Sequence, residues 1–123
     1  MKAILIDSKN KTVSHVDIPS GENHLKEMYK KIGCECFCSA GSFNNGDTIY
    51  VDDEGLINET GDFFVLYCLR KDPLAGNALI LGCDDEGFSI DCKTDISLIK
   101  PIFIDKQMVC VIYSMMNSIS TRN

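Results

Sequence analysis

Short apolar runs, each bounded by turn residues, recur along most of this chain, and they predict a fold built largely of β-strands. Several runs alternate apolar and polar side chains, which is the pattern of a strand with one buried face. The predicted strands cover 2–7, 12–18, 34–39, 47–51, 63–69, 77–82 and 88–92. The run 63–69 is apolar on both faces, which predicts a central strand. Turn residues join the first two runs and the last two, which predicts β-hairpins and a mixed or mainly antiparallel sheet.

One segment has a different period and predicts the main helix, over about residues 21–32. Its apolar side chains recur at helical spacing and form a single stripe. The residues of that stripe are Leu25, Met28, Tyr29 and Ile32. Ser20 is positioned as the N-cap, and Gly33 stands where a left-handed residue commonly ends a helix.

The end of the chain is less regular. A short second helix, capped by Thr94 or Asp95, is expected before Pro101. The run 108–115 predicts either a strand or a buried helix. The polar segment 117–123 is expected to fray.

The length of 123 residues fits one domain, and no linker or shift in composition divides the chain. Apolar residues make up 45% of it and charged residues 24%, which is close to the average of globular proteins and argues against disorder. We therefore expect a single α+β domain over 1–123, with a mixed or mainly antiparallel sheet, one main N-terminal helix and a possible short second helix.

The chain begins with an apolar run that Asp7 interrupts, which is too short for a secretory signal, and no later run is long enough to span a bilayer. This pattern predicts a cytoplasmic protein. The seven cysteines are an odd number, and in a reducing compartment we expect buried apolar thiols rather than disulfides. They are Cys34, Cys36, Cys38, Cys68, Cys83, Cys92 and Cys110.

The formal net charge of −6 disfavours direct binding to nucleic acid, because an acidic surface repels the phosphate backbone. Two kinds of partner remain open: a basic protein, or a small ligand held by a few local cations. No membrane partner is expected.

Three cysteines, Cys34, Cys36 and Cys38, alternate along a predicted strand, so their thiols should share one face. Their spacing lacks the second ligand pair that zinc sites commonly use. We expect a buried row of thiols in a core strand instead.

Two acidic segments with the sequence DDEG, 52–55 and 84–87, lack the ligand spacing of a calcium loop and are predicted to be hairpin turns. His15 and His24 show no metal-ligand spacing, and the chain carries no phosphate-binding loop or nucleophile elbow. We therefore predict no enzymatic activity, no metal and no cofactor.

Loops held by the sheet are the candidate binding regions. One loop offers amides and the aromatic face of Phe43, and another offers the neighbouring cations Arg70 and Lys71, which could hold a phosphate or a carboxylate. The candidate ligand-binding residues are Phe43, Asn45, Tyr50, Arg70, Lys71, Asn77 and Arg122. Solvated hairpin loops without a ligand remain the alternative for both regions.

Four segments occur along the chain in the order MKAILIDSKNKTVSHVDI, KKIGCECF, GDTIYVDDEGLIN and DPLAGNALILGCDDEG. In these segments the chain resembles a family of short proteins from phages and mobile elements that is catalogued as a domain of unknown function. The resemblance covers roughly residues 1–92, which makes 93–123 an extension of the same domain.

The resemblance implies a biological context and no catalytic residues. Short acidic phage proteins often counter host defence, and this chain is similar in size and β-rich body to the cyclic ADP-ribose sponges directed against Thoeris defence. It implies a homo-oligomer in the host cytoplasm that sequesters a small phosphorylated signal, such as a cyclic nucleotide or an ADP-ribose-like compound. Two alternatives remain open: an acidic inhibitor that binds a host defence protein directly, and an accessory domain with no ligand.

Overall fold

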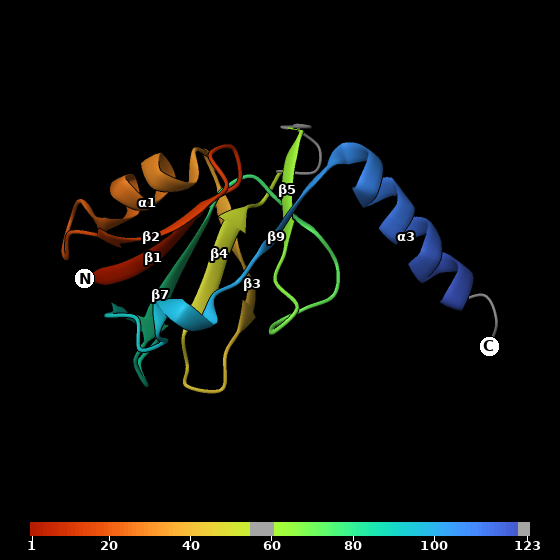
Figure 1. The fold of residues 1–123 in the computed structure, drawn as a ribbon. Coiled ribbons are helices and arrows are strands. Elements are labelled where there is room, and N and C mark those ends of the chain that lie inside the picture. The colour runs from red at the N-terminus through yellow and green to blue at the C-terminus, as the bar shows by residue number, and fades with distance from the viewer. Residues whose placement is uncertain (55–60, 121–123) are drawn as a thin grey trace.

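The computed structural model describes residues 1–54 and 61–120. This part of the chain forms two antiparallel sheets and two α-helices, which confirms the predicted α+β class and the mainly antiparallel pairing (Figure 1). The strands are β1 (Lys2–Asp7), β2 (Thr12–Asp17), β3 (Phe37–Ser42), β4 (Thr48–Asp52), β5 (Asp62–Val65), β6 (Leu74–Ala75), β7 (Ala78–Cys83), β8 (Ser89–Ile90) and β9 (Ile102–Asp105). The helices are α1 (His24–Ile32), the 3₁₀ helix η1 (Ile96–Leu98) and α3 (Lys106–Ser120).

The larger sheet has the strand order β2-β1-β7-β4-β3, and the short β8 pairs with one end of β7. The central strand β7 is apolar at successive positions because both of its faces are covered. Leu79 and Leu81 pack with Met28 of α1 on one face. Ala78 and Ile80 belong to the apolar cluster on the opposite face. The alternation of side chains along the strand thus produces two separate core layers.

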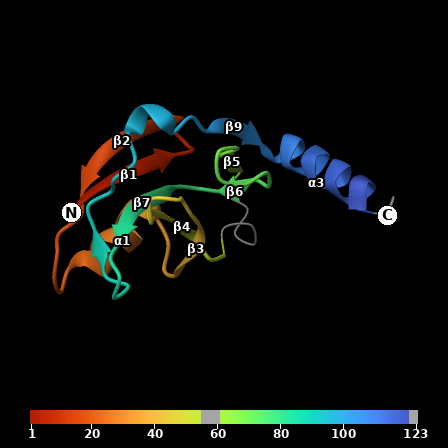
Figure 2. The same ribbon diagram turned by 90° about the horizontal axis from the view of Figure 1, so that it is seen from below.

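The second sheet, of order β6-β5-β9, covers the face of the large sheet that α1 leaves free (Figures 1 and 2). Phe64 of β5 packs with Ile4 and Ile80 between the two sheets. On the other side of β5, Phe63 packs with Val109 of α3. The order is therefore α1, large sheet and small sheet, and the first part of α3 packs on the small sheet through Val109 while the helix extends away from it (Figures 1 and 2).

The strand predicted over 63–69 is too long. β5 ends earlier, and the chain then turns so that the amides of Leu69 and Arg70 donate to the carbonyl of Leu66. Tyr67 lies on the outside of this turn with 58% of its surface exposed. β5 is a central strand, as predicted, but of the small sheet, because its two buried faces contact the large sheet and α3.

Helix α1 begins later than predicted. Gly21 has a left-handed φ of 86°, and its carbonyl accepts a hydrogen bond from the amide of His24 at 3.3 Å, so a turn precedes the helix. Ser20 is therefore not the N-cap; Asn23 occupies that position without a side-chain cap hydrogen bond. The predicted end is confirmed, because Gly33 has the left-handed φ of 77°.

The apolar stripe of α1 is confirmed only in part. Met28 and Ile32 are buried against the large sheet. Tyr29 is half-buried beside Phe37, with ring centroids 5.0 Å apart. Leu25, in the first turn, is 46% exposed and belongs to none of the buried clusters of the described residues.

The shared face predicted for the thiols of 34–39 is wrong. β3 begins only after Cys36, because the chain first bends beyond the end of α1, and the carbonyl of Cys36 accepts the amide of Asp53 there at 3.0 Å. Cys34 packs in the cluster on the α1 side of the large sheet, whereas Cys38 packs in the cluster on the other side. The segment is thus a bend followed by an edge strand.

All seven cysteines are free thiols, and none of them is fully buried. Cys36, Cys68 and Cys110 are exposed, which contradicts their predicted burial. Cys36 and Cys68 lie in bends of the chain, and Cys110 lies on an outer side of α3, so local geometry turns these thiols away from the core.

The acidic turn predicted after β7 is confirmed. The amide of Asp84 donates to the carbonyl of Phe88 at 2.9 Å and closes the hairpin between β7 and β8. The Asp84 side chain accepts the amide of Glu86, and Asp52 accepts the amide of Glu54 in the same way, both at 2.9 Å. The rest of the first acidic turn lies outside the described residues.

Beyond β8 the chain contributes Ile99 to the core between the two sheets. Asp95 caps η1 by accepting the amide of Ser97 at 2.9 Å, which confirms one of the two predicted caps.

Residues 108–115 belong to α3, so they form a helix, but the helix is half-exposed rather than buried. No helix in the described residues is long and apolar enough to cross a membrane. Residues 121–123, with the candidate Arg122, lie outside the described residues.

Candidate functional site

The predicted ligand-binding residues that the structure describes do not come together in one site. Phe43 and Asn45 lie in the hairpin between β3 and β4, where Phe43 is half-buried against the core. The Asn45 side chain accepts the amide of Asp47 and donates to the hydroxyl of Thr94, each at 3.0 Å. Both residues thus contribute to the shape of the hairpin.

Asp47, beside them, is a fully buried carboxylate that holds the segment after β8. It accepts the amide and the hydroxyl of Thr94 at 2.7 and 2.5 Å, the amide of Lys93 at 3.0 Å and the thiol of Cys92 at 3.2 Å. Burial alone would raise the pKa of Asp47, but these hydrogen bonds together lower it below its usual value. Burial and the contact with Asp47 raise the pKa of Cys92 to about 12. Asp47 is therefore a structural anchor.

Arg70 is held by groups of the protein itself. Its Nε donates to Asp72 at 2.8 Å, its Nη2 pairs with the second oxygen of Asp72, and its Nη1 donates to the carbonyl of Ala40 at 2.9 Å. The hydrogen bond from Arg70 is the main reason that the pKa of Asp72 is lowered. This arrangement fastens the loop after β5 to the edge strand β3, so an anion would have to displace Asp72. Lys71 is exposed beside it.

The remaining described candidates lie elsewhere. Tyr50 is on the α1 side of the large sheet, where its ring meets that of Phe37 edge-on at 5.5 Å, whereas Phe43 packs on the other side. Asn77 accepts the amide of Ser8 at 3.2 Å and donates to the carbonyl of Lys31 at 3.3 Å. It therefore joins β1, the end of α1 and β7 rather than facing the loop of Arg70.

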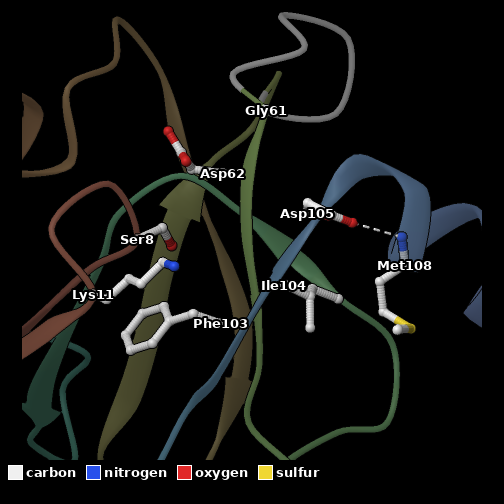
Figure 3. A pocket seen from close by; sticks show the side chains of 8 residues that line it. All are labelled: Ser8, Lys11, Gly61, Asp62, Phe103, Ile104, Asp105 and Met108. Atoms are coloured by element: carbon white, nitrogen blue, oxygen red, sulfur yellow. Dashed lines mark hydrogen bonds between the residues drawn. The ribbon is translucent and has the colours of Figure 1, made fainter.

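A hollow of about 340 Å³ lies instead between the β1–β2 turn, the start of β5, β9 and the first turn of α3. The residues that line it are Ser8, Lys11, Gly61, Asp62, Phe103, Ile104, Asp105 and Met108 (Figure 3). Figure 3 shows Lys11 and Phe103 extending toward the same part of the hollow, while Ile104 projects to the other side of β9. The hollow thus follows an edge of the small sheet.

Lys11 is held in this hollow by an unusual turn. Among the described residues it is the one non-glycine with a positive φ, of 56°. Asp7 shapes the turn by accepting the amide of Asn10 at 3.1 Å and its side-chain amide at 2.8 Å. A left-handed conformation is unfavourable for lysine, and such outliers motivate a functional hypothesis for the side chain they present.

The opposite side of the hollow carries carboxylates and apolar groups. Asp105 accepts the amide of Met108 at 2.9 Å and so caps the beginning of α3. Asp62 is the first residue of β5, and it already interacts with another group of the protein. The lining of the hollow thus includes one cation, one aromatic ring and two carboxylates, and the Asp105 carboxylate is turned toward the amide of Met108 (Figure 3).

A second hollow of about 330 Å³, beside Arg70, is chemically less suited to an anion. Asp52, Asp53 and Asp72 line it, and Arg70 is already paired there. The neighbouring Cys38 has a pKa raised by burial and by its hydrogen bond to Asp53, so its thiol stays protonated near neutral pH. In the described part of the chain no group of three or more His, Cys, Asp or Glu side chains could hold a metal ion.

Residues 1–102 match the family model DUF3846, which is described as a domain of unknown function. The chain belongs to the DUF3846 family. The match confirms the resemblance to a family of unknown function and extends it past residue 92. It carries no link to phages or to Thoeris defence, which stay predictions. The comparisons with curated proteins and with solved structures found no match.

The DUF3846 match ends at the first residue of β9, so it covers only part of the lining of the hollow. Ser8 and Lys11 lie within the matched region, whereas Phe103, Asp105 and Met108 follow it. Sequence reasoning missed these residues. Lys11 was assigned only to a turn, since nothing in its sequence context reveals a left-handed φ, and β9 was not predicted at all.

Proposed function

We propose that the protein binds a small phosphorylated compound with an aromatic ring, of the nucleotide class, in the hollow beside Lys11. The observation that carries this proposal is the presence of a lysine amine and an aromatic ring, Lys11 and Phe103, in one hollow of about 340 Å³. That volume lies at the small end of the range for ligand sites and suits a single nucleotide-sized compound.

Each lining group has a matching part in such a ligand. The ammonium group of Lys11 would pair with a phosphate, and the ring of Phe103 would contact the face of a base. The carboxylate of Asp62, which also lines the hollow, would accept hydrogen bonds from ribose hydroxyls or an exocyclic amine. This acceptor favours a nucleotide over inorganic phosphate, which it would repel.

The proposed action is retention of the ligand without chemical change. Neither histidine nor cysteine is among the described residues that line the hollow, and Asp105 caps α3. Tight retention of a nucleotide-like signal would make the protein a sponge of the kind expected in counter-defence. In this proposal the main cation that holds the phosphate is Lys11, instead of Arg70 as the sequence predicted.

The proposal is tested by isothermal titration calorimetry with a panel of mononucleotides, cyclic nucleotides and ADP-ribose cyclisation products. At least one member should bind, and Lys11→Met should weaken that binding at least about tenfold, because a charge-assisted hydrogen bond is lost. Lys9→Met is the matched control, since Lys9 lies in the same turn and does not line this hollow.

Two results would contradict the proposal. One is the absence of heat with every member of the panel, which would favour an acidic inhibitor of a host protein. The other is equal binding by Lys11→Met and the wild type, which would move the ligand site away from the hollow.

A further inference from the structure

Helix α3 exposes an apolar stripe that the rest of the molecule does not cover. Met108, Val111 and Met115 are exposed to 47%, 51% and 61% of their surfaces. They follow one another at intervals of three and four residues, so they lie on one side of the helix. In Figures 1 and 2 the helix extends away from the sheets, and both views leave this end of the molecule without a neighbouring element.

The stripe is separate from the side of α3 that contacts the body. Val109 is buried, and Tyr113 packs partly against the same cluster, with Phe63 and Ala75 of the small sheet. In a helix these two positions point away from the stripe, and Ile112 lies between the two sides. The body of the protein therefore covers only part of the apolar surface of α3.

The pattern matches what a second helix requires. A spacing of three and four residues is the seam of a two-helix coiled coil, in which Met108, Val111 and Met115 would take successive core positions. The positions that flank such a seam usually carry the charges that select a partner. Here Gln107, Ile112 and Ser114 would flank it, and none of them is charged.

The charge distribution favours a second copy over a basic partner at this helix. The chain has a formal net charge of −6, so two copies repel each other over most of their surface. α3 carries no charged residue after Lys106. In a twofold dimer the same patch meets itself, so like charges close to the axis would face each other, and α3 brings none there. A basic partner, by contrast, would be drawn to the acidic body and not to this helix.

We infer that a second copy of the chain covers the stripe, by pairing α3 with α3 across a twofold axis. Few side chains form the contact, so the dimer should be weak, with a dissociation constant of roughly micromolar order. The dimer does not depend on the proposed ligand. Because Met108 also lines the hollow beside Lys11, the helix of the second copy would lie next to that hollow.

Sedimentation equilibrium of the full chain tests this inference. The wild type should show a monomer–dimer equilibrium, and Val111→Glu should weaken dimerisation at least about tenfold, because two carboxylates would be brought together in an apolar contact. Cys110→Glu is the matched control: it adds the same charge to the same helix, at an exposed position that is neither in the stripe nor among its flanking residues, and should change the equilibrium far less. Circular dichroism checks that both variants are folded.

Salt dependence supplies an independent measurement. A dimer held by an apolar contact between two acidic bodies should become tighter as salt increases, because salt screens the repulsion. A wild type that remains monomeric, or equal weakening by both glutamate variants, would overturn the inference. Either result leaves ligand binding by the monomer intact, and the calorimetry with Lys11→Met fails or succeeds separately.

Discussion

At the scale of the residue, Lys11 has an unfavourable backbone conformation. Its side chain is also the one cation among the described residues that line the hollow. Asn10 precedes it and would tolerate the left-handed region better, as would a glycine. A lysine at this position fits the proposed use of its amine in ligand binding, at a cost in the stability of the fold.

We therefore predict that Lys11→Gly stabilises the fold by about 0.5–1 kcal/mol, because glycine adopts a positive φ without the steric penalty of a Cβ. Urea unfolding measures the difference. The same variant should lose ligand affinity as Lys11→Met does. Lys9→Gly is the control and should bring no gain, because the positive φ belongs to Lys11 and not to Lys9. A loss of stability in Lys11→Gly would show that the lysine side chain itself supports the turn.

At the scale of the element, Gly82 is a position where β7 has no room for a side chain. In the described part of the chain every glycine except Gly82 has a positive φ. A Cβ at Gly82 would collide with the carbonyl oxygen of Asp91 and would lie 2.9 Å from Cγ1 of Ile90. The close approach of β8 to β7 thus depends on the missing side chain.

Gly82→Ala should destabilise the protein by about 1–3 kcal/mol, because the segment around Asp91 must move away from β7. Thermal unfolding monitored by circular dichroism measures this loss. The double variant Gly82→Ala with Ile90→Ala should not restore stability, since the closest contact is with backbone and not with the Ile90 side chain. Full recovery in the double variant would contradict this explanation.

At the scale of the whole molecule, Asp47 connects segments that are distant in the sequence. It joins the β3–β4 hairpin to Lys93 and Thr94, from which the chain continues through η1 to the small sheet. Ile99, just after η1, completes the core between the two sheets. The carboxylate therefore contributes to the stability of the complete fold.

The folded state lowers the pKa of Asp47 below its usual value of 3.8. Its stabilisation is therefore fully present above that value and is lost as the pH falls through the lower folded pKa. Asp47→Asn should reduce the free energy of unfolding by about 2–4 kcal/mol at neutral pH, because several donors lose a charged acceptor. Urea unfolding from neutral to acidic pH should show the gap between variant and wild type closing below the folded pKa. Asp85→Asn, an exposed acidic turn residue, is the control; a constant gap at every pH would contradict the prediction.

Local chemistry alone determined much of the fold. The strand 2–7 and its hairpin partner and the left-handed end of α1 at Gly33 were predicted, and Asp95 was one of the two caps predicted for η1, because each depends on residues that are close in the sequence. The run 77–82 was also predicted as a strand, but its cover on both faces became visible only in the structure.

Only the tertiary structure decided which apolar and charged groups meet. Arg70 was predicted to bind a ligand, yet Asp72 and the carbonyl of Ala40 occupy its guanidinium. The candidate hollow joins Lys11 to Phe103, which lie on separate elements that no local pattern relates. Periodicity shows that a side chain needs cover but not what covers it, because that depends on contacts between distant segments. For the same reason α3 could be predicted as an apolar element, while its uncovered stripe became visible only once the body beside it was in place.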